Sequence, residues 1–164
     1  MEQQGELVVE NREFEEEDVV IINRLHFNIP FIRRHYFDNP EIYTRLTLGD
    51  IGIITQILDH PRRGARATVV NIRLVYTRNP EIQGQQIYIN INHILLSPFI
   101  DYLGVRYRLG DIILYYDQAA QIIHFNRDNT IRILWPLNNA MQIELAININ
   151  AITAIINNIC AATA

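Results

Sequence analysis

The sequence predicts a mainly β protein, an antiparallel barrel or sandwich, on three observations. Apolar and polar residues alternate over several segments, β-branched and aromatic residues fill the runs between them, and turn-forming residues separate these runs at short, regular spacing. Such close spacing favours antiparallel meanders over helical crossovers.

The alternation is clearest in two segments. In "QIYININHI", Ile87, Ile89 and Ile91 alternate with polar or aromatic positions, and "QIELAININ" repeats the pattern from Ile143 to Ile149. Because successive side chains of a strand point to opposite faces, each segment presents one apolar face. We therefore expect both segments to be half-buried strands.

Further strands are predicted from β-branched and aromatic content, and turns from proline, glycine and asparagine between them. The predicted strands are 67–76, 111–116, 121–125 and 130–135. The predicted turns lie at 59–65, at Asn79, Pro80 and Gly84, and at 126–129.

The C-terminal segment has a different period. Ile152, Ile155, Ile156, Ile159 and Cys160 recur at the spacing of one apolar stripe on a helix, and Asn150 is an acceptable N-cap. We expect a short α-helix over 151–164. A second short helix is predicted over 30–37, since proline is tolerated at a first helical position.

Length and charge predict the organisation of the chain. The 164 residues suit one compact β domain over 19–150, preceded by an acidic arm over 1–18 that holds eight acids against Arg12. This arm is either solvated or contacts a basic surface. No apolar run is long enough for a membrane span, and no secretory signal is recognisable. We expect a protein of the cytoplasm or of a virion, without membrane partners.

The tetrapeptide Leu-Gly-Asp-Ile occurs twice, at Leu48–Ile51 and at Leu109–Ile112. Pro-Phe-Ile also occurs twice upstream, each time after a histidine, His26 or His93. These matches predict an internal duplication of one β unit, with copies over 24–85 and 91–147.

The Gly-Asp pair in each copy is interpreted as a turn that starts a strand. Glycine adopts backbone conformations closed to other residues, and aspartate accepts hydrogen bonds from nearby backbone. The alternative is a carboxylate pair, in which Asp50 and Asp111 approach each other and share a proton. Isoleucine follows both aspartates, where such a pair typically has a hydroxyl neighbour.

The sequence carries few groups for catalysis, and we expect a protein that is not an enzyme. Lysine is absent, Ser97 precedes a proline, and Cys160 is the only cysteine. The five histidines lack metal-ligand spacing, and the glycines form no phosphate loop. We therefore expect no cofactor, no metal and no small-molecule substrate.

Arginine clusters support nucleic-acid binding as an alternative function. The candidates lie in three groups: Arg33 and Arg34; Arg62, Arg63 and Arg66; and Arg106 and Arg108. Guanidinium groups beside aromatic rings suit phosphates and stacked bases. The alternative is that these are solvated loop arginines that pair with Asp59 or with the acidic arm.

The residues Pro98, Leu103-Gly104 and Gly110-Asp111 are similar to the Pro-to-Gly-Asp stretch of AbrB-like swapped-hairpin DNA-binding domains. The resemblance implies a small duplicated barrel. Asp101 stands where that family has an arginine after the proline.

The C-terminal residues Ile156, Cys160 and Ala164 are similar in spacing to the elongin-C-binding box of ubiquitin-ligase substrate receptors. This resemblance implies a ligase adaptor whose helix, with Ile152, Ile155, Ile156, Ile159 and Cys160, binds a partner. The absence of lysine would suit a receptor that avoids its own ligase.

The function we expect first is self-association. Strands with one apolar face and unpaired edges are templates for further chains, and a structural subunit of capsid or filament type uses such edges. We therefore predict a homo-oligomer.

Overall fold

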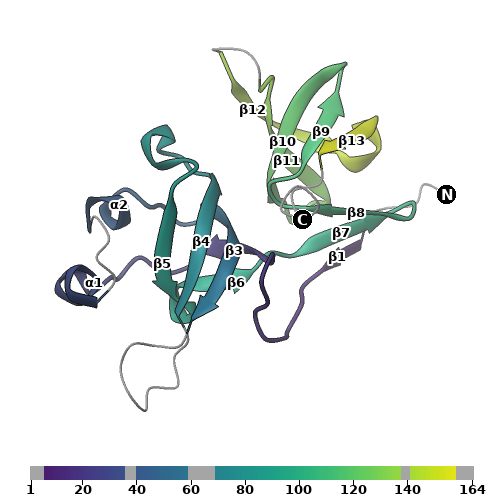
Figure 1. Cartoon of the computed structure of the whole chain (residues 1–164). Coiled ribbons are helices and arrows are strands. Elements are labelled where there is room, and N and C mark those ends of the chain that lie inside the picture. Colours follow the sequence, from purple (N-terminus) through teal and green to yellow (C-terminus); the bar gives the residue numbers. More distant parts are fainter. Residues whose placement is uncertain (1–5, 36–39, 59–68, 138–140, 158–164) are drawn as a thin grey trace. The chain divides into compact units, whose positions relative to one another are not determined.

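The computed structural model describes residues 6–35, 40–58, 69–137 and 141–157. The described residues are mainly β, with strands in three antiparallel sheets and only short helices (Figure 1). The chain divides into two compact units. Unit 1 comprises Met1–Asn11 and Ser97–Ala164, and unit 2 comprises Arg12–Leu96.

Unit 2 contains a five-stranded antiparallel sheet in the order β5-β4-β3-β2-β6. Two short α-helices follow its first strand, and two 3-10 turns flank β5. The elements are β2 (Val19–Ile22), α1 (Ile29–His35), α2 (Pro40–Thr44), β3 (Ile51–Leu58), β4 (Val69–Tyr76), η1 (Pro80–Ile82), β5 (Gln86–Asn90), η2 (Ile91–His93) and β6 (Ile94–Leu96).

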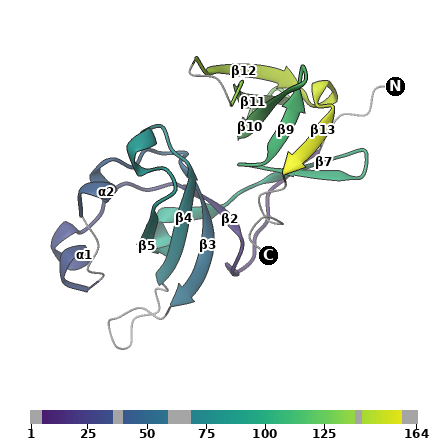
Figure 2. The same ribbon diagram turned by 45° about the horizontal axis from the view of Figure 1, so that its top comes forward.

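Isoleucine, leucine and valine side chains from every strand of this sheet form the core of unit 2. Ile32 of α1 and Tyr43 of α2 are buried against the same core, so both helices pack on the sheet. In both views α1 and α2 lie on the β5 side of the sheet (Figure 2). The predicted helix over 30–37 is confirmed as α1 for its described part.

Unit 1 contains a three-stranded sheet and a second five-stranded sheet. Their orders are β1-β7-β8 and β12-β11-β10-β9-β13, all antiparallel. The elements are β1 (Glu6–Val8), β7 (Phe99–Tyr102), β8 (Val105–Arg108), β9 (Ile112–Tyr115), β10 (Gln118–Phe125), β11 (Thr130–Trp135), β12 (Ile143–Asn148), η3 (Ile149–Ala151) and β13 (Ala154–Asn157).

The two five-stranded sheets have the same connectivity. In each, four consecutive strands form a meander, a 3-10 turn follows the fourth strand, and the fifth strand returns to pair antiparallel with the first. The same residues make the 3-10 turn, because Ile-Asn-Ile-Asn occupies both 89–92 and 147–150. Asn90 and Asn148 are the N-cap residues of η2 and η3.

The two Leu-Gly-Asp-Ile copies form the same turn, as predicted. Gly49 and Gly110 have φ of 92° and 88°, a region that glycine adopts without strain. Asp50 and Asp111 each accept a hydrogen bond from the backbone N–H three residues earlier, at 2.9 and 2.8 Å. In unit 2 the backbone of the Gly-Asp turn is hydrogen-bonded to β2, which comes before the turn in the chain. In unit 1 the backbone of the turn is hydrogen-bonded to β10, which comes after it.

The predicted closed barrel is wrong, because neither five-stranded sheet pairs its two outer strands with each other in the described residues. The predicted C-terminal helix over 151–164 is also wrong for its described part. Residues 149–151 are a 3-10 turn, and Ala154–Asn157 form β13, which pairs with β9. Positions 158–164 lie outside the described residues.

The helical spacing of these isoleucines was misleading because β9 offers an edge for pairing. Thr153 donates its backbone N–H and its hydroxyl to the carbonyl oxygen of Leu114, both at 3.1 Å. These bonds start the pairing of β13 with β9, and the strand satisfies the edge of the sheet.

Candidate functional site

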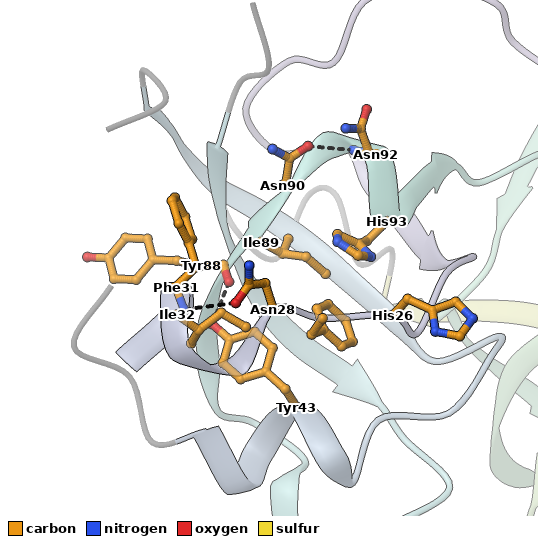
Figure 3. Close-up of a pocket in the computed structure, with 11 residues that line it drawn as sticks. His26, Asn28, Phe31, Ile32, Tyr43, Tyr88, Ile89, Asn90, Asn92 and His93 are labelled. Carbon is orange, nitrogen blue, oxygen red and sulfur yellow. Dashed lines mark hydrogen bonds between the residues drawn. The ribbon is translucent and has the colours of Figure 1, made fainter. Parts of the chain in front are cut away.

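A pocket in unit 2 has a cavity volume of about 260 Å³ and lies between the helical segment and the β5–η2 segment (Figure 3). Its walls combine aromatic rings with side-chain amides. The residues that line it are His26, Phe27, Asn28, Phe31, Ile32, Tyr43, Tyr88, Ile89, Asn90, Asn92 and His93.

One wall is built from the two short helices. Asn28 starts α1, because its Oδ1 atom accepts from the N–H of Phe31 at 3.1 Å and its carbonyl accepts from Ile32 at 3.0 Å. The Tyr43 hydroxyl of α2 donates to the carbonyl oxygen of Tyr88 on β5 at 2.5 Å. This bond holds α2 against β5 and closes one end of the pocket.

The opposite wall is the 3-10 turn η2. Asn90 caps it, since its Oδ1 atom accepts from the N–H of Asn92 at 2.9 Å. The cap sets the position of His93, whose ring stacks on Phe27 with centroids 4.4 Å apart and planes at 24°. Phe27 also contacts Tyr43 edge to face, with centroids 5.2 Å apart.

Burial is the main cause that lowers the pKa of His93 from 6.5. The hydrogen bond to the backbone of Arg24 acts in the opposite direction, and nearby positive charge adds to the lowering. The Nδ1 atom of His93 lies 3.1 Å from the carbonyl oxygen of Arg24, which can only accept. In the neutral ring, Nδ1 therefore carries the proton and Nε2 is left as an acceptor.

The pocket offers hydrogen-bond groups together with aromatic faces. Only the Oδ1 atoms of Asn28 and Asn90 are engaged in the hydrogen bonds above, so their Nδ2 groups remain donors. No carboxylate or guanidinium belongs to the residues that line the pocket. Such a site suits a flat, uncharged ring with polar edges.

Positive charge lies in the same chain segment as the pocket. Arg24, Arg33 and Arg34 are exposed, and residues 23–35 hold no aspartate or glutamate. Arg33 and Arg34 follow the pocket residues Phe31 and Ile32 directly on α1. Of the three arginine clusters predicted from the sequence, that of Arg33 and Arg34 is therefore close to the pocket along the chain.

The cluster of Arg106 and Arg108 lies on β8 of unit 1 and is engaged by acids and an aromatic ring. Arg106 makes two hydrogen bonds to Asp101, at 2.9 and 3.1 Å, and these bonds lower the pKa of that carboxyl group. Both guanidinium groups lie over the ring of Phe99, at 3.8 and 5.1 Å from its centroid. Arg108 also reaches Glu10 at 3.5 Å. The contact of Arg108 with Glu10 is the predicted pairing with the acidic arm, whereas Arg106 pairs with Asp101, which the alternative did not include.

Other predicted site residues lie partly outside the described part of the chain. Arg62, Arg63 and Arg66 do so, as do Ile159 and Cys160. Ile152 precedes β13, and Ile155 and Ile156 belong to that strand. The helix that the elongin-C-box resemblance implies is therefore absent at its first position, Ile156.

Asp50 and Asp111 are buried and serve their own turns. Among the described residues, no group of three or more His, Cys, Asp or Glu side chains is placed to hold a metal ion. No helix in the described ranges is both long enough and apolar enough to cross a membrane.

Sequence reasoning missed most of the pocket. The sequence pattern identifies His26 and His93 only as the histidines that precede the two Pro-Phe-Ile copies. It assigns no binding role to Phe27, Asn28, Tyr43 or Tyr88. The available signal was composition, because "HFN" at 26–28 and "YININH" at 88–93 each combine an aromatic ring, asparagine and histidine. No protein-family model matches this chain, and no curated protein matches it significantly.

Proposed function

We propose that the chain is a non-enzymatic binding protein for single-stranded nucleic acid, with a base held in the pocket of unit 2. The observation that carries this proposal is the pocket itself, in which aromatic rings and asparagine amides are combined beside a segment rich in arginine. Double-stranded nucleic acid fits less well, because its bases are paired and stacked.

The pocket walls match the flat face and the polar edge of an unpaired base. Phe31 and Tyr88 are partly exposed and supply aromatic surface, and base-to-aromatic stacking contributes roughly 1–3 kcal/mol per base. The Nδ2 groups of Asn28, Asn90 and Asn92 suit the carbonyl and ring-nitrogen acceptors of a base edge. The residues that line the pocket include no serine, cysteine or threonine nucleophile that His26 or His93 could activate, which supports binding over catalysis.

The exposed arginines would contact the phosphates. Each phosphate neutralised on a single strand contributes roughly 0.7 to the slope of log affinity against log salt concentration. Changing Arg33 and Arg34 together to glutamine should therefore lower that slope by about 1.4. The control is Arg127→Gln, an exposed arginine in the β10–β11 turn of unit 1, which should leave the slope unchanged.

The base site is tested with a matched pair of substitutions. Asn92 lines the pocket and is exposed, whereas Asn150 occupies the corresponding position of η3 in unit 1. Asn92→Asp and Asn150→Asp make the same change of shape and charge. We expect Asn92→Asp to weaken binding about tenfold, because an acceptor replaces a donor group and a hydrogen bond is lost.

The measurement is fluorescence anisotropy with labelled oligonucleotides of roughly 12 nucleotides, poly(dA) and poly(dT), at several salt concentrations. Mononucleotides serve as competitors and show whether a free nucleotide occupies the same pocket. Equal affinities of the Asn92→Asp and Asn150→Asp variants would contradict the base site. Absence of oligonucleotide binding at low salt would remove the proposed function.

Self-association, the function that the sequence analysis expects first, is the second candidate function. The observation that favours it is an outer strand with exposed apolar side chains, since Ile143 on β12 is 49 % exposed and the preceding Met141 is 79 % exposed. A structural subunit of capsid or filament type would use such an edge. Light scattering over a concentration series tests this candidate, and a constant monomer at micromolar levels would remove it.

We also infer that the two units descend from one duplicated β unit. The shared strand order, the shared 3-10 turn and the repeated Ile-Asn-Ile-Asn sequence support this inference. These features align β2 with β9, whereas the Leu-Gly-Asp-Ile copies align β3 with β9. The duplication is therefore better described by the strand order than by the repeats at 24–85 and 91–147.

A further inference from the structure

The outer strands of the three sheets differ in how their free edges are protected. An unprotected edge pairs readily with another chain, whereas short length, charge or a covering side chain prevents this. In unit 2, the Tyr43 hydroxyl occupies the carbonyl oxygen of Tyr88 on the outer strand β5, and β6 has only three residues. In unit 1, β1 is equally short, β8 carries Arg106 and Arg108, and β13 has only four residues.

Strand β12 has none of these protections among the described residues. It has six residues, it ends the order of its sheet, and Glu144 is its single charged residue. Its burial is low for a strand with four apolar residues. Ile143 is 49 % exposed, and Leu145 is only half-buried.

The exposed apolar residues of β12 lie on the face that packs on the core. Ile143, Leu145 and Ile147 alternate onto one face, and the register places Leu145 beside Ile133 and Ile147 beside Ile131. Both neighbours on β11 are fully buried. Ile143 and Leu145 stay exposed because the sheet ends at β12, so a further strand would complete their burial.

We propose that β12 pairs antiparallel with β12 of a second copy of this chain, centred on Leu145. In this register Leu145 lies opposite Leu145 of the second copy, and Ile143 lies opposite Ile147. Glu144 lies opposite Ala146, so no like charges face each other. This proposal rests on self-association, the second candidate function, and assigns the surface that performs it.

Other registers of the same pairing are less favourable. Centring the pair on Glu144 places two carboxylates directly opposite each other, which is destabilising. Shifting the register by a single residue would oppose residues of different faces, which the pleat of a strand forbids. Moving the centre to Ala146 places Glu144 opposite Asn148 and leaves Ile143 opposite Ile149, which already lies in the 3-10 turn.

Sedimentation velocity across a micromolar concentration series measures the association, with Ile143→Asp as the disrupting variant. Leu103→Asp is the matched control, because Leu103 is 67 % exposed in the β7–β8 turn of the same unit. We expect Ile143→Asp to weaken dimerisation by about tenfold or more, since each dimer contains two affected pairs. Leu103→Asp should dimerise like the unmodified chain.

Disulfide crosslinking tests the register. In a Cys160→Ser background, chains with Glu144→Cys and chains with Ala146→Cys are mixed and oxidised. Opposed residues of antiparallel strands lie within the separation that a disulfide spans. We expect the mixture to form a crosslinked heterodimer faster than either variant alone forms a homodimer.

The possible outcomes distinguish a wrong β12 interface from the absence of self-association. Dimerisation that persists in Ile143→Asp, without crosslinking in the mixture, would overturn the β12 interface while self-association stands. An unmodified chain that stays monomeric over the whole series would overturn both. Faster crosslinking of Glu144→Cys with itself would overturn the register centred on Leu145.

Discussion

Replacing Asp50 with alanine should destabilise unit 2 strongly, because its buried carboxylate accepts hydrogen bonds from two segments of the chain. Asp50 is 1 % exposed. Its carboxylate accepts from the N–H of Thr47 at 2.9 Å, from the hydroxyl of Thr47 at 2.6 Å and from the N–H of Arg78 at 3.2 Å. The turn before β3 and the segment after β4 therefore share one acceptor.

The magnitude follows from the donors that would be left without a partner. Alanine removes the acceptor for two backbone N–H groups, and each unsatisfied buried group costs roughly 1–3 kcal/mol. Partial relaxation and entry of water reduce the sum, so we expect a loss of about 3 kcal/mol in the free energy of unfolding. This is a large fraction of the stability of a small domain, which is typically about 5–15 kcal/mol.

Urea unfolding followed by far-ultraviolet circular dichroism measures this loss as a lower midpoint. The control is Asp101→Ala, because Asp101 is an exposed aspartate whose partner is Arg106. Exposed ion pairs contribute little, so the control midpoint should hardly change. If Asp50→Ala shifts the midpoint no more than this control, the hydrogen bonds of the Gly-Asp turn do not stabilise the fold, and the reasoning is refuted.

Three further predictions concern unit 2. Gly52→Ala should cost about 1–3 kcal/mol of stability, because its Cβ would lie 3.1 Å from Cδ1 of Ile72 and 3.3 Å from a backbone oxygen; an unchanged urea midpoint would contradict this. Stability should fall as the pH drops from about 7.5 to about 5.5, because burial lowers the folded pKa of His93 and the unfolded chain then binds more protons. His93→Gln should show a smaller fall between the same two pH values, and an identical fall would exclude this residue as a cause. Tyr43→Phe should cost about 1 kcal/mol, read by thermal unfolding, because it removes the hydrogen bond to Tyr88; the absence of any loss would mean that the bond does not hold α2 on β5.

Much of the secondary structure could be predicted from local pattern. The strand over 130–135 coincides with β11, and the turn at 126–129 joins β10 to β11. The Gly-Asp turns were predicted with their physical cause, because both the positive φ and the aspartate acceptor are properties of the residues themselves. Local chemistry of this kind needs no distant partner.

The alternating pattern was misleading at both Ile-Asn-Ile-Asn segments. Alternation extended the predicted strands through Ile91 and Ile149, but each strand ends at an asparagine that caps a 3-10 turn. At Asn90 the side chain competes with strand pairing, because its Oδ1 atom binds the backbone N–H of Asn92. Asn148 ends β12 without a side-chain cap bond. The repeat of four residues was the signal that identified the turn.

The candidate site was the part least accessible to sequence reasoning. Phe27 and His93 are far apart in the chain and stack only because η2 ends beside the segment before α1. The Arg106 and Arg108 cluster was predicted as a binding surface, but its partners Asp101 and Glu10 lie on other strands or segments of unit 1. Side chains separated by many residues meet through packing, which a local pattern does not encode.

By itself the sequence determined that this protein is built from antiparallel strands with isoleucine cores and Gly-Asp turns, because periodicity and turn chemistry act over a few residues. Only the tertiary structure decided that the last isoleucines form a strand, that the sheets stay open, and that a pocket forms beside β5. Those outcomes depend on which edges and surfaces remain unpaired after the local elements have formed, and pairing between distant segments settles them.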